Sequence, residues 1–292
     1  MSSERMKIDV HHHILPPEYV SALAAAGIND AAGRPFPDWD PEVSLALMDR
    51  HGIETAVTSI SAPGVYFGDR GAARELARRC NEYSARLVAE YPGRFGAFAV
   101  LPLPDVEGAL RELAYALDAL RLDGVALLSS VDGRYMGDPV YDPLFDELHR
   151  REAVVFMHPD MPPAGSGSAL GLPPSLMEFV FETTRAVANL LFGGTLERCP
   201  GVRFILPHAG GTVPYIALRL SLGQFWPGLQ EQVPQGVVAY LRRLYYDTAL
   251  SGAPFALRSL QELVDDSHIL VGSDAPFAPV LPPLAPVGGR EG

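Results

Sequence analysis

Three consecutive histidines, His11, His12 and His13, directly follow the apolar segment Met6–Val10, which has the composition of a β-strand. Side chains of a strand alternate between two faces, so His11 and His13 are expected on one face and His12 on the other. Two imidazoles on one face supply half of the ligands of a typical zinc site. We expect His12 to point toward surrounding helices, so that its replacement affects packing more than chemistry. A purification tag is usually a longer run of histidines in a flexible, polar setting, which does not match this segment.

Further candidate ligands follow later predicted strands. His158 follows the fifth strand, His208 the sixth and Asp274 the eighth. Together His11, His13, His158 and Asp274 form a suitable ligand set for one divalent metal ion, which favours Zn²⁺ and is compatible with Mn²⁺. His208 is then free, near the metal, to act as a general acid or base. This chemistry requires no organic cofactor.

The predicted elements explain how these residues could meet. Short apolar or β-branched runs alternate with longer segments of helical periodicity from Ile53 onward, which is typical of repeated β-α units and a parallel sheet. The predicted strands are Met6–Val10, Ile53–Ile60, Phe95–Leu101, Gly124–Leu128, Val154–Met157, Val202–Leu206, Leu244–Asp247 and Ile269–Val271. The predicted helices are Pro41–His51, Ala72–Tyr91, Val106–Leu120, Pro143–Arg151, Ser175–Leu191, Thr212–Phe225 and Pro254–Val264. Eight strands that alternate with helices predict an α/β fold, a (β/α)₈ TIM barrel that forms one domain over residues 1–292, with its site at the C-terminal ends of the strands.

The lysine content bears on the number of metal ions. Lys7 is the only lysine, since the other basic residues are arginines. Many binuclear metallohydrolases with barrel folds bridge two ions through a carboxylated lysine late in a strand, and no lysine follows position 7. We therefore expect a mononuclear site, or one bridged by carboxylates. His51, His149 and His268 lack a comparable setting at a strand end and are expected to be structural or exposed.

Two long segments interrupt the alternation. Residues 14–40 contain several prolines and glycines and are expected to form an insertion loop over the site. Residues 160–174 follow His158 directly and are expected to border the same pocket. Aromatic side chains near strand ends in the sequence suit a planar aromatic ligand: Phe36, Trp39, Tyr66 and Phe67.

The chain beyond Asp274 is short and rich in proline. Proline cannot continue a helix, so residues 275–292 are predicted to be an irregular tail, and the closing helix of the barrel is predicted to be missing. Two explanations stay open. A partner chain covers that groove, or the chain is shortened, naturally or by artefact.

The composition excludes several classes of partner. A net charge of −12 and the lack of a basic patch argue against nucleic acid and anionic membranes. No apolar run reaches the ~18 residues of a membrane span. The N-terminal residues lack the apolar core of a signal peptide, so a cytoplasmic location is expected. Cys80 and Cys199 are expected to be reduced thiols.

Four motifs resemble the amidohydrolase superfamily: Asp-Val-His-His-His-Ile-Leu-Pro at 9–16, Phe-Met-His-Pro at 156–159, Leu-Pro-His-Ala-Gly-Gly at 206–211 and Gly-Ser-Asp-Ala-Pro-Phe at 272–277. The closer resemblance is to its metal-dependent decarboxylases, which include aminocarboxymuconate semialdehyde, resorcylate and 6-methylsalicylate decarboxylases. This resemblance spans nearly the whole chain. It implies that His11, His13, His158 and Asp274 bind the metal and that His208 is catalytic.

The resemblance also implies two substrate-binding arginines. Arg34 resembles the arginine that holds a substrate carboxylate in the semialdehyde enzyme, although its spacing to the following Trp-Asp-Pro differs. Arg219 matches an arginine that such enzymes lend to the neighbouring subunit's pocket, so a homodimer is expected. A second family arginine falls here at Pro227, which favours a smaller aromatic acid over the dicarboxylate of that enzyme.

We expect a non-oxidative decarboxylase, a carbon–carbon lyase, that acts on a small aromatic or muconate-like carboxylic acid. His208 and Asp274 are the expected acid–base residues. The same ligands could instead activate water, so a metal-dependent hydrolase of a lactone or amide is an alternative. A catalytically impaired barrel that binds a metal or a partner is a further alternative, motivated by the missing closing helix.

Overall fold

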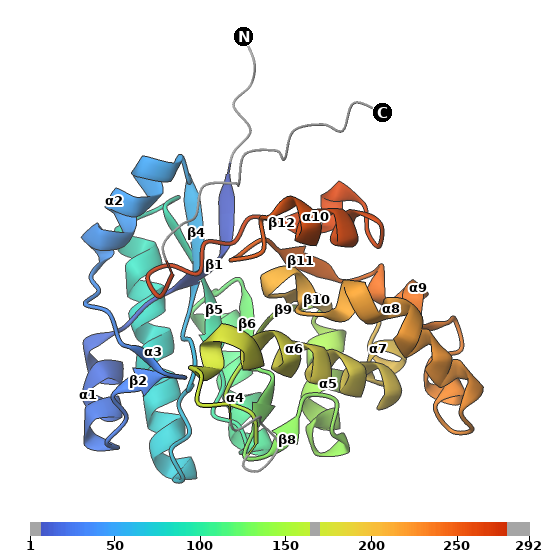
Figure 1. Ribbon diagram of the computed structural model, residues 1–292. Coiled ribbons are helices and arrows are strands. Elements are labelled where there is room, and N and C mark those ends of the chain that lie inside the picture. Colours follow the sequence, from blue (N-terminus) through green and yellow to red (C-terminus); the bar gives the residue numbers. More distant parts are fainter. Residues whose placement is uncertain (1–6, 164–169, 279–292) are drawn as a thin grey trace, which may run out of the picture.

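The computed structural model describes residues 7–163 and 170–278. Eight parallel strands form one sheet in the order β1-β4-β5-β6-β9-β10-β11-β12 (Figure 1). Isolated bridges from Asp9 to Val271 and from His12 to Ala275 join the first strand to the segment around the last one. The sheet therefore closes on itself, and the predicted TIM barrel is confirmed.

The barrel strands are β1 (Ile8–His13), β4 (Thr55–Ser59), β5 (Phe95–Val100), β6 (Gly124–Leu128), β9 (Val154–His158), β10 (Arg203–Leu206), β11 (Tyr245–Asp247) and β12 (Ile269–Leu270). Two antiparallel pairs lie outside it: β2 (Asp30–Ala31) with β3 (Arg34–Pro35), and β7 (Ser130–Val131) with β8 (Arg134–Tyr135). The predicted strands match these closely, except the first. That strand continues through the histidines because His13 pairs with Ser59 on one side and donates its N–H to the Ala275 carbonyl on the other.

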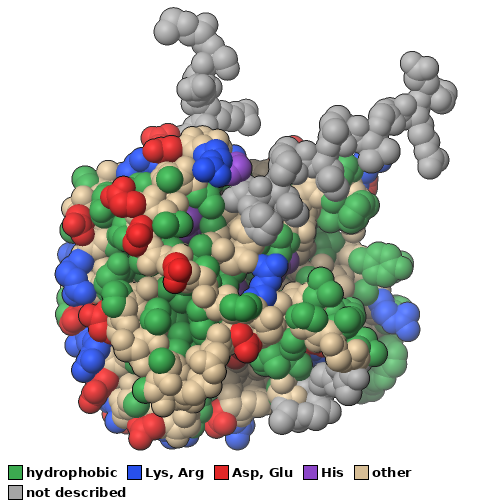
Figure 2. Space-filling model, turned by 60° about the vertical axis from the view of Figure 1, so that its left-hand side comes forward, with side chains coloured by type: hydrophobic (Ala, Val, Ile, Leu, Met, Phe, Trp, Pro, Cys, Tyr) green, Lys and Arg blue, Asp and Glu red, His purple; other side chains and the backbone are tan. Residues whose placement is uncertain are grey.

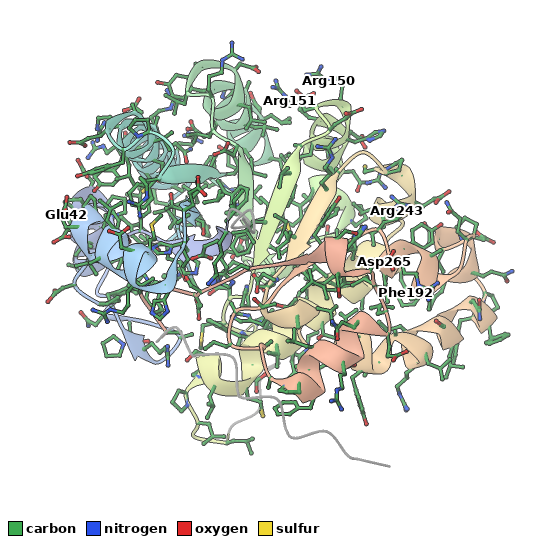
Figure 3. The ribbon with its side chains drawn as sticks, turned by 90° about the horizontal axis from the view of Figure 1, so that it is seen from above. Glu42, Arg150, Arg151, Phe192, Arg243 and Asp265 are labelled. Carbon is green, nitrogen blue, oxygen red and sulfur yellow. The ribbon has the colours of Figure 1, made fainter. Side chains whose placement is uncertain are left out.

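The helices are α1 (Pro17–Ala25), α2 (Pro41–His51), α3 (Arg70–Glu90), α4 (Val106–Ala114), α5 (Asp142–Arg150), α6 (Pro174–Phe192), α7 (Thr195–Arg198), α8 (Val213–Ser221), α9 (Val237–Leu241) and α10 (Pro254–Gln261). They surround the strands, with charged side chains such as Glu42 and Arg150 at the periphery (Figure 3). The helix predicted over 106–120 ends in a π-helical turn, Tyr115–Ala119. Among the described residues, no helix is long and apolar enough to cross a bilayer.

Several helices begin at a capping aspartate. Asp40, Asp69 and Asp105 each accept a hydrogen bond from a backbone N–H of the first turn of α2, α3 and α4, respectively. These side chains satisfy donors that a helix start leaves without partners. These caps fix where α2, α3 and α4 begin, and the predicted starts of these helices lie within two residues of the observed ones.

The insertion differs from its prediction. Residues 14–40 are not one irregular loop, since they contain α1 and the β2–β3 hairpin. α1 buries only Tyr19 and Leu23, too few positions to reveal an amphipathic helix in the sequence. The hairpin turns at Gly33, whose φ of +85° favours glycine and whose N–H bonds the Asp30 carboxylate at 2.7 Å.

The interior of the barrel is apolar. Val10, Phe98, Ala126, Phe156 and Ile205 form a buried cluster contributed by five different strands. The rings of Phe98 and Phe156 stack with their centroids 5.6 Å apart. Two larger apolar clusters fill the space between the strands and the outer helices. The polar groups at the strand ends therefore lie next to a closely packed apolar layer inside the barrel.

Parts of the predicted loops lie outside the described residues. Residues 271–278 contain no helix, and the predicted irregular tail beyond them falls on residues 279–292, which the structure does not describe. Of the predicted loop 160–174, residues 164–169 are also outside. On the face that Figure 2 shows, acidic and basic side chains are intermixed rather than gathered into one basic patch.

Candidate metal centre and active site

The structure brings the four predicted ligands together. His11 and His13 extend from β1, His158 ends β9, and Asp274 lies in the segment after β12. One ligand atom from each residue lies within 4.8 Å of all the others. The Nε2 atoms of His11 and His13 are each 3.3 Å from Asp274 Oδ1. Among the described residues, this is the group of histidines and carboxylates that could hold a metal ion.

Neighbouring groups orient the three imidazoles. Each ring uses Nδ1 for a hydrogen bond: His11 to the Asp247 carboxylate at 2.7 Å, His13 to Ser59 Oγ at 3.1 Å, and His158 to its neighbouring Pro159 carbonyl at 2.7 Å. The Nε2 atoms then face the centre. Within the described part of the chain, those of His11 and His13 are buried without a hydrogen-bond partner. Buried polar atoms rarely lack partners, so these two atoms fit a bound cation.

Burial and neighbouring charges shift the pKa values of the four candidate ligands. Burial lowers the pKa of His158 well below its usual value and also lowers that of His13, which favours neutral imidazoles. Although burial opposes it, the close approach of the surrounding histidines holds the pKa of Asp274 well below its usual value. Burial lowers the pKa of His11 as well, but Asp247 and Asp274 outweigh it and raise that pKa to about 10. The same carboxylates would favour a divalent cation in place of the His11 proton.

Asp247, at the end of β11, is a functional residue that sequence reasoning missed. It is fully buried, and its Oδ2 holds His11 while its Oδ1 accepts hydrogen bonds from the N–H groups of His208 and Ala249, both at 2.9 Å. Gly272 leaves room for it, because a Cβ there would come within 2.9 Å of the Asp247 carboxyl carbon. Its position as the last residue of the seventh predicted strand was the available signal.

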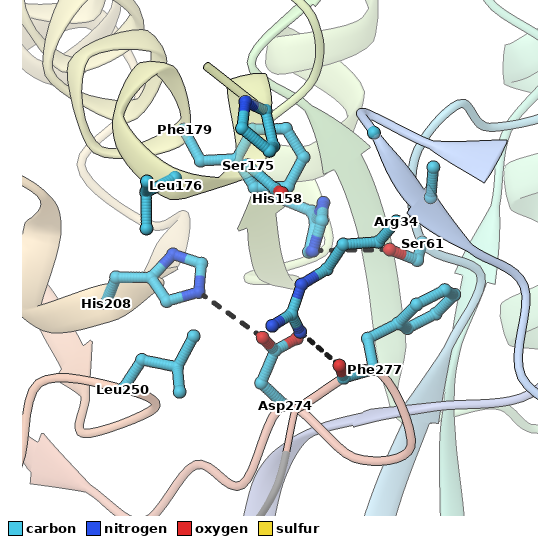
Figure 4. A pocket seen from close by; sticks show the side chains of 13 residues that line it. Arg34, Ser61, His158, Ser175, Leu176, Phe179, His208, Leu250, Asp274 and Phe277 are labelled. Carbon is cyan, nitrogen blue, oxygen red and sulfur yellow. Dashed lines mark hydrogen bonds and ion pairs between the residues drawn. The ribbon is translucent and has the colours of Figure 1, made fainter.

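His208 is close to the four ligands but separate from them. It begins a tight turn, His208–Gly210, with a φ of +54°. Its Nε2 is 3.9 Å from Asp274 Oδ2, and its buried Nδ1 has no hydrogen-bond partner among the described residues. A substrate atom could therefore lie against His208 and Asp274 together (Figure 4).

A cavity of about 470 Å³ opens above these groups. Its polar lining includes Ser61, Ser175 and Arg34, whose guanidinium reaches beside Asp274 and donates to the Phe277 carbonyl (Figure 4). The remaining lining is largely apolar: Ala31, Pro173, Leu176, Phe179, Leu250 and Phe277. The cavity thus combines the Arg34 guanidinium, the imidazoles of His158 and His208, the Asp274 carboxylate and apolar walls.

The aromatic lining was predicted wrongly. Phe36, Trp39, Tyr66 and Phe67 are not among the described residues that line this cavity. Phe36 and Trp39 pack against the core of the molecule instead, with Trp39 in ring contact with Tyr83. The missed wall residues come from α6 and from loops that are distant in sequence, so proximity to a strand end was a poor guide.

The other predicted residues have clear positions. Arg219 lies on the exposed side of α8 and does not line the described cavity of its own chain. His149 accepts a hydrogen bond from the Gly201 N–H, and His268 stacks on Tyr245 while bonding the Leu244 carbonyl, so both are structural. His12 is fully buried and points away from the centre toward α2, as expected.

Comparisons with known proteins find related decarboxylases. A decarboxylase of Aspergillus niger, yanB, is 39% identical over 94% of this chain and 78% of its own length. The 6-methylsalicylic acid decarboxylase of Penicillium expansum is 37% identical over 94% of this chain and 86% of its own. A dihydroxybenzoic acid decarboxylase of Polaromonas, solved with manganese and the inhibitor 2-nitroresorcinol, superposes with a TM-score of 0.79 at 26% identity over 94% of this chain and 88% of that one. A model of the family described as amidohydrolase matches residues 8–289, and the chain therefore belongs to the amidohydrolase family.

Proposed function

We propose that this protein is a metal-dependent, non-oxidative decarboxylase of a small aromatic carboxylic acid. The observation that carries the proposal is the cavity in which Arg34 and His208 face the four-ligand centre between apolar walls. The Arg34 guanidinium suits a substrate carboxylate, and the apolar walls suit an aromatic ring. His208 can supply the proton that replaces the carboxylate. The similarity to 6-methylsalicylic acid decarboxylase supports the same chemistry here.

The donor set supports one divalent ion, held by His11, His13, His158 and Asp274. We propose Zn²⁺ from the three nitrogen ligands, with Mn²⁺ as the alternative that the manganese of the Polaromonas structure supports. When bound, the ion supplies Lewis-acid polarisation of a substrate oxygen. No organic cofactor takes part in the proposed reaction.

Residues of the chain position the substrate. The Arg34 guanidinium binds the carboxylate, as a planar fork of donors suits two carboxylate oxygens. Leu176, Phe179 and Leu250 contact the faces of the ring and exclude water from it. The carbon that bears the carboxylate then lies within reach of His208 and Asp274.

His208 and Asp274 form the proposed acid–base pair. One member delivers a proton to the ring carbon that bears the carboxylate, and a π-electron pair of the ring forms the new C–H bond. The C–C bond to the carboxylate then breaks, its electron pair returns to the ring, and CO₂ leaves. Solvent replaces the proton on the acid, so each turnover consumes one proton and releases one CO₂.

The test is CO₂ release from metal-loaded protein. We expect CO₂ and the matching phenol from 6-methylsalicylate, salicylate or 2,6-dihydroxybenzoate. The matched comparison uses lactones of similar size, and chromatography detects the ring-opened product. Ring opening without CO₂ from any acid would make the protein a hydrolase, and metal binding without either reaction would make it an impaired barrel.

We also propose a homodimer in which Arg219 contributes to the partner's pocket. Exposed apolar side chains support an interface on the same helix and its continuation, since Tyr215 is 87%, Leu218 81% and Phe225 73% exposed. Such residues are rarely clustered on the surface of a monomer.

A further inference from the structure

Asp9 lies at the point where the barrel closes. This carboxylate is fully buried, and no arginine or lysine of the described chain pairs with it. Its oxygens accept hydrogen bonds from the N–H groups of His11 at 3.1 Å and Ser273 at 3.0 Å, and from Ser273 Oγ at 2.5 Å. Since Asp274 follows Ser273, Asp9 joins two segments that carry three of the four candidate metal ligands.

His12 continues this set of bonds away from the centre. Its Nδ1 lies 3.1 Å from Asp9 Oδ2, and its Nε2 lies 2.8 Å from Ser44 Oγ in α2. Ser44 Oγ in turn accepts the indole N–H of Trp39 at 2.9 Å. All these groups are satisfied when Trp39 donates to Ser44, Ser44 to His12 Nε2, and His12 Nδ1–H to Asp9.

The outer end of the chain of bonds lies in the insertion. Trp39 follows the hairpin that carries Arg34, and Arg34 itself donates to the carbonyl of Phe277, beyond Asp274. The insertion is thereby attached to the closing segment 273–277 through His12 and through Arg34. Asp9, His12 and Ser44 are buried, and hydrogen bonds between buried groups are well suited to keep ligands at fixed separations.

We propose that Trp39, Ser44, His12 and Asp9 form a positioning relay, which holds His11, His13 and Asp274 at metal-binding separations and couples them to the insertion. His12 is thus a positioning residue rather than a ligand or a simple packing residue. The inference rests on the proposed metal centre but not on the proposed reaction.

Two substitutions of His12 remove its two hydrogen bonds, to Asp9 and to Ser44, one at a time. In His12→Asn, the amide nitrogen can occupy the position of Nδ1 and still donate to Asp9, but the contact with Ser44 is lost. In His12→Gln, the amide can reach Ser44 from the position of Nε2, but the bond to Asp9 is lost. The matched control is His149→Gln, which removes the hydrogen bond from the Gly201 N–H far from the site.

Two readouts apply to each variant. The first is the dissociation constant for Mn²⁺, measured by titration of chelator-treated protein. The second is hydrogen–deuterium exchange of peptides that cover residues 8–14 and 270–278, where the Asp274 N–H bonds the His11 carbonyl and the His13 N–H bonds the Ala275 carbonyl. Exchange does not depend on metal or turnover.

For His12→Gln we expect the Mn²⁺ constant to rise by about 10-fold or more, the usual effect of losing an outer-shell partner, with faster exchange in both peptides. For His12→Asn we expect a change below about threefold, and for His149→Gln none. If His12→Gln fails to fold, Ser273→Ala carries the same expectation, because it removes another donor to the same Asp9 oxygen.

Equal metal constants and equal exchange for the two His12 variants would overturn the relay, even if both lowered the melting temperature. If unaltered protein binds Mn²⁺ but releases no CO₂ from any acid tested, the proposed function fails, while the relay is still judged by both readouts. If it binds no metal, slower exchange in His12→Asn than in His12→Gln supports the relay, and equal exchange overturns it.

Discussion

The histidine ligands of the candidate metal centre are oriented by hydrogen bonds on the side of each ring that faces away from the centre. Asp247, Ser59 and the Pro159 carbonyl each hold one Nδ1 atom, which turns the Nε2 atoms of three histidines toward one point. The ligands were predictable because each lies in or after a strand of a regular pattern. The groups that orient them were not, because each comes from a different part of the chain and has no motif around it.

Substitutions of two histidines should separate metal binding from catalysis. His208→Ala should lower kcat by at least about 100-fold, the usual contribution of general acid–base catalysis, and keep about one metal ion per chain. His158→Ala should lose both, because it removes a ligand from the buried group. Turnover and elemental analysis on the same preparations decide this, with His149→Ala as the control. Loss of metal from His208→Ala would contradict the division of roles.

Metal affinity should increase with pH because of His11. Without the ion, Asp247 and Asp274 raise the pKa of His11 to about 10 against the effect of burial. Both ring nitrogens of His11 are therefore protonated at neutral pH, and the ring is positively charged. A metal at Nε2 displaces the proton on that atom, whereas the lowered pKa values of His13 and His158 leave none to displace there. The dissociation constant should therefore fall by about tenfold per pH unit from roughly pH 7 toward 10.

Calorimetry in two buffers of different ionisation enthalpy measures the proton that the metal displaces. We expect close to one proton released per ion at pH 7.5. Asp247→Asn should release less, because it removes the carboxylate bonded to His11 Nδ1. Affinity that does not change with pH would show that His11 is already neutral without the metal.

At the scale of elements, regular repeats were predictable and the insertion was not. The barrel strands from β4 onward match their predictions within about two residues, because buried apolar runs alternate with helical segments. α1 and the β2–β3 hairpin were missed, since α1 buries only two side chains and the hairpin strands have two residues each. The prediction of which aromatic side chains line the cavity was wrong because long-range packing decides which side chains reach it, and the sequence pattern does not reveal that packing.

The hairpin should matter for substrate binding through Arg34. Arg34→Gln should raise KM for aromatic acids by about 10- to 100-fold, the range expected when one charge-assisted hydrogen bond to a carboxylate is lost. The metal content should not change, and Arg34→Lys should recover part of the loss. The control is Arg50→Gln on the exposed side of α2. An unchanged KM would remove Arg34 from the substrate site.

At the scale of the whole molecule, one face is unusually apolar. Tyr215, Leu218 and Leu222 lie at spacings of three and four residues along the outer side of α8 and its continuation, and Phe225 and Trp226 follow. This stripe has the periodicity of a helix face that packs against a partner. Arg219 lies within it, so a second subunit on this face would cover Arg219.

Disruption of this face should separate the subunits. Leu218→Asp should convert a dimer into a monomer in analytical ultracentrifugation and lower activity, because a charge replaces an apolar side chain that is 81% exposed in the single chain. Val43→Asp is the control, since Val43 is also exposed but lies on α2, among the elements at the opposite side of the barrel in Figure 1.

The role of Arg219 can be tested by mixing subunits. Arg219→Ala should remain dimeric but raise KM, since its pocket would lack the partner's cation. Mixed with inactive His208→Ala chains, it should recover part of its activity, because an intact Arg219 then completes a pocket that retains His208. A monomeric unaltered protein, or a mixture no more active than its components, would confine the active site to one chain.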